Sequence, residues 1–268
     1  MPNVFIERVA KAKCVAIFVA ALLLSACVTT QTGGFEDKKD PKKAVEYSIQ
    51  AARNYIQEGN WEAAKRHLKT ALEIDDHNAD AHETLAVVFW STGEYEQADK
   101  HFRMAIGQDS ANSRIRNNYA AFLYDRKRYA EAETQLEKVA EDLLYEKRAE
   151  AFVNLGMVRV RLKKYAAAKD TFERAYLMDR SDIRIVFQLA EVNYQLGDYA
   201  KSQSFYEAYR KQVPAQSAAS LWLGIRLADK AGDHNAMASY ALALRNLFPQ
   251  SEEYLAYKSA YSDAGTQH

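Results

Sequence analysis

The chain has 268 residues, and its 36 Lys and Arg balance 36 Asp and Glu, so the formal net charge at neutral pH is zero. This balance argues against a general nucleic-acid binder, which needs a surplus of cations on one face. Two cysteines exclude a disulfide-stapled mini-domain and leave too few ligands for a cysteine-rich zinc module. Only 10 Gly and 4 Pro are present, which favours helices over strands.

The N-terminal segment is predicted to be an export signal. Arg8, Lys11 and Lys13 give it a positive start, and an apolar run over 14–24 follows. A helix of that length rises about 16 Å, roughly half of the hydrocarbon core of a bilayer, so the run is too short to span comfortably. The charged start, the short apolar run and the small residues after it are typical of a signal peptide, which we assign to 1–26.

The signal ends in Leu24-Ser25-Ala26-Cys27, which resembles the lipobox of bacterial lipoproteins. In that family the cysteine thiol is acylated and the chain is cut before it, so the resemblance implies that Cys27 carries the lipid. An ordinary secretory signal with a chance cysteine is the alternative. Val28 stands where an Asp commonly retains such lipoproteins in the inner membrane. The resemblance therefore implies the outer membrane as destination, with the protein facing the periplasm.

A repeat of about 34 residues fills most of the remaining chain. Aromatic residues recur at this spacing, each followed three positions later by a small residue; they are Trp61, Tyr95, Tyr129, Tyr165 and Tyr199. Each unit has the pattern of two amphipathic helices joined by a tight turn, and one such pair cannot bury its apolar faces alone. The pattern resembles the tetratricopeptide repeat. It predicts an all-α, right-handed superhelical solenoid of stacked helix pairs.

These patterns divide the chain into a tether, six repeats and a cap. Residues 27–44 are polar and lack periodicity, so we expect a flexible tether there. A short capping helix and a tail are expected over 251–268. The six predicted repeats, of which the last is degenerate, are 45–78, 79–112, 113–148, 149–182, 183–216 and 217–250.

Three segments go beyond a generic repeat consensus. They are Asn117-Asn118-Tyr119-Ala120-Ala121-Phe122-Leu123, the run 141–145 and Ser220-Leu221-Trp222-Leu223-Gly224-Ile225-Arg226. With the lipobox, they resemble the PilF/PilW family of type IV pilus biogenesis and stability lipoproteins, although Leu143 and Ala120 replace a Pro and a Gly of that family. The resemblance implies a pilotin, which binds the subunits of the pilus secretin and promotes their localisation and multimerisation in the outer membrane. A repeat lipoprotein that scaffolds cell-wall hydrolases or other periplasmic proteins is the alternative.

The first helix of each pair lines the concave face of such repeats and is the expected binding surface. The candidate groove residues are Ile49, Arg53, Ile56, Val87, Trp90 and Asn117. An apolar groove anchored by Trp90 would suit an apolar strand or helix of a partner. Alternatively, Trp90 packs on its neighbour as part of the core. On the groove hypothesis, Trp90→Ala weakens binding and leaves thermal unfolding nearly unchanged. Asn117 could hold an extended backbone, or could be a solvated or capping residue.

No enzyme activity, cofactor, metal, nucleic acid or small-molecule substrate is expected. His82-Glu83 lacks the second His, four residues after the first, that a zincin helix needs. The sequence contains no Gly-rich phosphate loop and no Gly-x-Ser-x-Gly motif. The expected partners are the secretin subunit and, through the lipid, the outer membrane.

Overall fold

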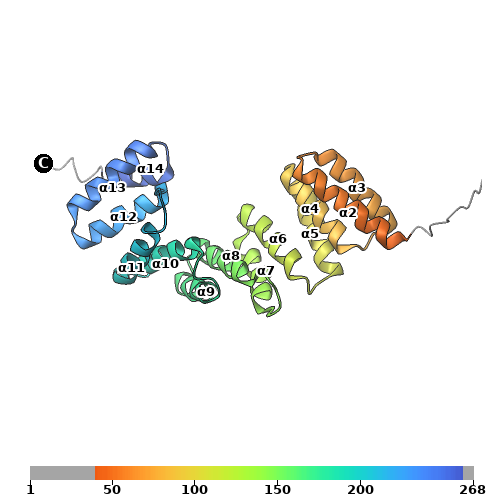
Figure 1. Ribbon diagram of the computed structural model, residues 1–268, viewed down its shortest axis with the longest axis horizontal. Coiled ribbons are helices and arrows are strands. Elements are labelled where there is room, and N and C mark those ends of the chain that lie inside the picture. Colours follow the sequence, from red (N-terminus) through yellow and green to blue (C-terminus); the bar gives the residue numbers. More distant parts are fainter. Residues whose placement is uncertain (1–39, 262–268) are drawn as a thin grey trace, which may run out of the picture. The chain divides into compact units, whose positions relative to one another are not determined.

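The computed structural model describes residues 40–261, and within that range the protein is built of 13 helices and contains no strands (Figure 1). The expected signal peptide and Cys27 lie outside the described residues. The helices are α2 (Pro41–Gln57), α3 (Trp61–Ile74), α4 (Ala79–Ser91), α5 (Tyr95–Gln108), α6 (Ser113–Asp125), α7 (Tyr129–Glu141), α8 (Arg148–Arg161), α9 (Tyr165–Met178), α10 (Ile183–Gln195), α11 (Tyr199–Arg210), α12 (Ala218–Ala231), α13 (His234–Leu247) and α14 (Glu252–Tyr261).

The helices follow one another as pairs, each joined by a tight turn. The two helices of a pair pack on each other, as α4 packs on α5 and α8 on α9, and successive pairs are also in contact. Each unit therefore buries its apolar faces against its own partner helix and its sequence neighbours, which is the packing of a repeat solenoid. The all-α solenoid fold expected from the sequence is confirmed.

One boundary differs from the sequence prediction. Helix α2 begins at Pro41, inside the segment 27–44 that was expected to be a tether. Asp40 caps it, because its carboxylate accepts the backbone N–H groups of Lys42 and Lys43 at 3.1 and 3.4 Å. Pro at the first helical position costs no hydrogen bond, and its fixed φ suits a helix start. The Asp-Pro pair is thus a helix start, and the last residues of the expected tether are helical.

The turns inside the pairs need one residue in the left-handed region. Gly59, Gly93 and Gly197 supply it with φ between 72° and 82°. In the third and fourth units the same place is taken by Lys127 and Lys163, with φ of 60° and 59°. A residue with a Cβ pays roughly 1 kcal/mol for this conformation, so these two turns are built at a cost that glycine would avoid.

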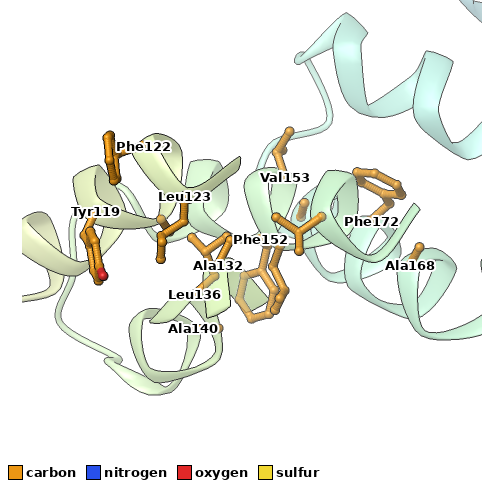
Figure 2. Packing of buried hydrophobic residues seen from close by; sticks show 14 of the residues in the cluster. Tyr119, Phe122, Leu123, Ala132, Leu136, Ala140, Phe152, Val153, Ala168 and Phe172 are labelled. Carbon is orange, nitrogen blue, oxygen red and sulfur yellow. The ribbon is translucent and has the colours of Figure 1, made fainter. Parts of the chain in front are cut away.

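The largest buried cluster extends from α4 to α10 and holds the central units together. Figure 2 shows part of it: Leu123 of α6, Leu136 of α7 and Phe152 of α8 come together, and Phe172 of α9 belongs to the same cluster. Fully burying one such side chain is worth about 1.5–3 kcal/mol. Smaller clusters continue the packing on both sides, over α2–α4 and over α10–α14.

A glycine lets α8 and α9 approach closely. A Cβ added to Gly156 of α8 would lie 2.5–2.7 Å from three ring atoms of Phe172, which is fully buried. Carbon atoms in contact are normally about 3.5–4.0 Å apart. The absence of a side chain at position 156 is therefore required by Phe172.

The last helix covers the end of the sixth unit. Tyr254, Tyr257 and Tyr261 of α14 pack against a cluster formed by α12 and α13, and the Tyr261 ring lies edge-on to Trp222 at 6.4 Å. Across residues 40–261, we find no helix with the length and apolar character needed to cross a membrane.

Candidate protein-binding face

Ion pairs connect the first helices of the first three units. Arg114 of α6 pairs with both Asp80 and Glu83 of α4, and Asn118 donates a hydrogen bond to Glu83 Oε1 at 2.5 Å. Arg53 of α2 lies 3.9 Å from Asp80. We call Arg53, Asp80, Glu83, Arg114 and Asn118 the charged network. Its α4–α6 contacts join residues 31, 34 and 35 positions apart, so they follow directly from the stacking of consecutive repeats.

The charged network has a buried centre. The side chain of Glu83 is only 4% exposed, and a carboxylate so placed is costly unless it is paired. Burial lowers the pKa of Arg114, but the carboxylates of Glu83 and Asp80 outweigh this effect and raise the pKa overall. Arg114 therefore remains charged and neutralises Glu83. This arrangement fixes the register of α4 against α6.

Polar contacts also link later first helices. Asn154 of α8 donates to Asn117 Oδ1 of α6 at 3.1 Å, and Arg161 donates to the Tyr124 hydroxyl at 2.8 Å. Further along, Arg226 of α12 donates to both carboxylate oxygens of Glu191 of α10, at 2.7 and 3.0 Å. Hydrogen bonds and ion pairs thus join first helices to one another from α2 to α8 and again from α10 to α12.

The groove prediction is wrong at Ile49. This residue is 5% exposed and belongs to the core cluster with Val45 and Ala52. The three lie at i, i+4 and i+7 along α2, which places them on the one stripe of the helix that faces its neighbours. Ile56 is half-buried and packs on the same cluster, so the apolar residues of α2 contribute to the core.

Trp90 and Val87 are half-buried and pack against the central cluster. The Trp90 ring meets Phe122 edge-on at 5.8 Å, and its Nε1 donates to Asp125 Oδ2 at 3.1 Å. Trp90 thus bridges α4 and α6. The expectation that Trp90→Ala leaves unfolding unchanged does not fit these contacts, because the substitution removes packing between two units.

Arg53 and Asn117 are the two candidates that present polar groups. The side chain of Arg53 is partly exposed and leans toward Asp80. Asn117 is half-buried, accepts the hydrogen bond from Asn154, and lines a cleft of about 550 Å³ between α6, the connection 142–147 and the start of α8. Of the six candidates, these two are the ones able to offer hydrogen bonds to a partner.

A buried histidine, His82, and a half-buried one, His101, form a pair inside the second unit. His82 of α4 and His101 of α5 share a hydrogen bond between their Nδ1 atoms at 3.0 Å, and His82 Nε2 lies 2.9 Å from the carbonyl oxygen of Asp76. Burial and the neighbouring His82 lower the pKa of His101 to about 4. Within residues 40–261, no three His, Cys, Asp or Glu side chains gather as a metal site would require.

Sequence reasoning missed Asp80, Glu83 and Arg114. Besides Arg53 and Asn117, it selected apolar residues for the groove, whereas the contacts between first helices are largely polar. The sequence did contain a usable pattern, because residues of opposite charge and amide residues lie about one repeat apart on successive first helices and face each other. A search for such pairs at 31–35 residue spacing would have found the α4–α6 contacts of the charged network.

Comparison with known proteins agrees with this architecture. Tetratricopeptide-repeat family models match residues 55–104, 112–181 and 153–217. The type IV pilus assembly protein PilF of Pseudomonas aeruginosa is 39% identical over 244 residues, which are 91% of this chain and 96% of that protein.

Solved structures show the same relationship. One from a functional characterisation of P. aeruginosa PilF has 40% sequence identity and a TM-score of 0.72, covering 83% of this chain and all of that one. The crystal structure of PilW, a type IV pilus biogenesis factor, shares the fold at 24% identity, with a TM-score of 0.69 and coverage of 80% of this chain and 97% of that chain. The chain therefore belongs to the PilF family of type IV pilus tetratricopeptide-repeat proteins.

Proposed function

We propose that this protein is an outer-membrane lipoprotein adaptor that binds the type IV pilus secretin subunit and promotes its outer-membrane localisation and multimerisation. The observation that carries the proposal is the similarity to PilF, a type IV pilus assembly protein, over nearly the whole chain. The repeat fold supports it, because stacked helix pairs present an extended surface suited to binding another protein.

The mechanism is one of anchoring and recognition. Cys27, which lies outside the described residues, would carry the lipid. One acyl chain binds a membrane only marginally, whereas two or more give stable anchoring. The helical repeats would hold the secretin subunit while the lipid directs the complex to the outer membrane. Assembly would then be promoted by local concentration, and no chemical step is required of the protein.

A deletion strain tests this function. Secretin multimers are measured on an unheated gel after the inner and outer membranes have been separated. Loss of outer-membrane multimers, restored by the wild-type gene, is the expected result. Normal multimers in the outer membrane of the deletion strain would end the proposal.

The anchor is tested separately. Cys27→Ser should give a folded protein that is released into the periplasm, because the acylated thiol is lost. Fractionation is done in cells that lack the secretin, so that the partner cannot hold the variant at the membrane. Continued recovery of the variant with the outer membrane would refute Cys27 as the lipid site.

A further inference from the structure

The connection between α7 and α8 is longer than the corresponding connections in the first, second and fourth units. It covers 142–147, whereas the corresponding connections in neighbouring units are 75–78, 109–112 and 179–182. Asp142 holds it in place, because its Oδ2 accepts the Ser113 hydroxyl at 2.6 Å and its Oδ1 accepts the Leu144 N–H at 3.0 Å. At the other end, Arg148 Nε donates to the carbonyl oxygen of Ala140 at 2.9 Å. The additional residues therefore have a defined conformation.

This fixed connection presents two leucines to solvent. Leu143 is 75% exposed and Leu144 is 92% exposed. Neither adds to the core, and each exposes apolar surface that water disfavours. Leu144 forms one wall of the cleft of about 550 Å³, opposite the first helix α6.

The other walls offer hydrogen-bonding groups. Asn117 uses its Oδ1 to accept from Asn154, and Asn118 uses its Nδ2 to donate to Glu83. Among the described residues, no hydrogen bond occupies Asn117 Nδ2 or Asn118 Oδ1. One free amide donor and one free amide acceptor match the C=O and N–H groups of a polypeptide backbone. A helix has already paired its backbone groups, so these amides suit an extended segment.

The charged side chains at the cleft that lack an ion-pair partner among the described residues are mainly acidic. Glu146, Lys147 and Glu150 line it, and within residues 40–261 none of the three has an ion-pair partner within 4 Å. The positive charge of Arg114 is already matched by Asp80 and Glu83. A partner that brings a Lys or Arg side chain is therefore favoured at this rim over one that brings a carboxylate.

We propose that this cleft binds an extended segment of the secretin subunit, with an apolar side chain against Leu144 and a basic side chain near Glu146 and Glu150. The backbone of the segment pairs with the free amide groups of Asn117 and Asn118. This inference rests on the proposed function for the identity of the partner. The position and chemistry of the cleft come from the contacts described above.

Photo-crosslinking in cells tests the contact directly. Leu144 is replaced by the photoreactive residue p-benzoylphenylalanine in the full chain, and Leu177 of α9, which is 70% exposed, is replaced as the control. We expect a light-dependent adduct with the secretin from position 144 and none from position 177. An adduct of position 144 with a different protein, or equal adducts from both positions, would overturn the proposal.

Charge reversal tests the recognition. Glu150→Lys is compared with Glu96→Lys, because both residues are acidic side chains in the first turn of a helix. Binding of purified secretin subunit to the full chain in detergent should weaken roughly five- to tenfold for Glu150→Lys and remain unchanged for Glu96→Lys. Equal affinities would overturn the proposal. Circular dichroism on both variants controls for folding, and crosslinking at position 144 decides the matter if Glu150→Lys fails to fold.

The two proposals fail differently. If the wild-type chain does not retain the secretin subunit at all, the proposed function is wrong. If the wild-type chain retains it but position 144 gives no adduct, the secretin binds elsewhere on the protein. In that case the cleft is rejected and the proposed function stands.

Discussion

Gly156→Ala should destabilise the protein, although alanine is the better helix former. Replacing a helical glycine with alanine normally gains about 0.5–1 kcal/mol. At Gly156 the new Cβ would lie 2.5–2.7 Å from three ring atoms of Phe172, about 1 Å inside normal contact. The ring is fully buried, so it has no free space to move into. Overpacking of this kind costs about 1–3 kcal/mol. A cost near the upper end of that range, less the gain in helix propensity, leaves an expected net loss of about 2 kcal/mol.

Gly107→Ala is the matched control. Gly107 lies in α5, and an added Cβ would meet nothing within 4 Å. This variant should therefore gain roughly 0.5–1 kcal/mol from helix propensity alone. The difference between the two variants isolates the steric effect at Gly156.

Urea denaturation followed by circular dichroism gives the free energies of unfolding. Amide hydrogen exchange should place the loss in α8 and α9, because each unit contacts mainly its neighbours. Adding Phe172→Leu to Gly156→Ala should recover stability, since the third unit carries Ala120 and Leu136 at the corresponding positions. A Gly156→Ala variant as stable as the wild type, or one that Phe172→Leu makes less stable, would refute the close approach of α8 and α9.

Three further substitutions test other parts of the structure. Trp90→Ala should lower the free energy of unfolding by about 2 kcal/mol, because a half-buried ring between α4 and α6 is lost; an unchanged thermal midpoint would contradict this. Lys127→Gly should raise the free energy of unfolding by several tenths to about 1 kcal/mol in the same assay. A lower free energy of unfolding for this variant would mean that the turn at φ 60° is not strained. His101 is neutral when folded, so its unfolded form binds more protons as the pH falls from 6.5 toward 4. After allowance for solvent screening, the free energy of unfolding of the wild type should fall by about 1 kcal/mol between pH 7 and pH 5. His101→Gln should reduce this fall. An identical pH profile for the variant would exclude His101 as the source of the pH dependence.

Much of the fold could be predicted because each repeat is specified by residue types at fixed local spacings. Aromatic residues at 34-residue spacing mark the start of second helices such as α5 and α7, and small residues mark the close contacts between helices. Asp40-Pro41 was missed as a helix start, because the polar composition around it resembles a linker. Capping chemistry, rather than composition, decides that boundary.

The candidate binding face was harder to predict. Ile49 was chosen for a groove, yet its side chain packs in the core, since the rotation of α2 about its axis depends on neighbouring helices. The charge pairing of Arg114 with Glu83 depends on how two repeats stack, which a single helix pattern does not reveal. Exposure of Leu144 follows from the turn that Asp142 fixes, a contact made with Ser113 in another helix.

Binding of the purified secretin subunit to the full chain in detergent is the most direct test of the central claim, that this protein is a secretin-binding adaptor. We predict saturable binding with a dissociation constant in the micromolar range or tighter, roughly −8 kcal/mol or more favourable. We also predict that the complex survives removal of the lipid by Cys27→Ser, because recognition belongs to the helical repeats. Absence of saturable binding by the folded wild-type chain would contradict the account.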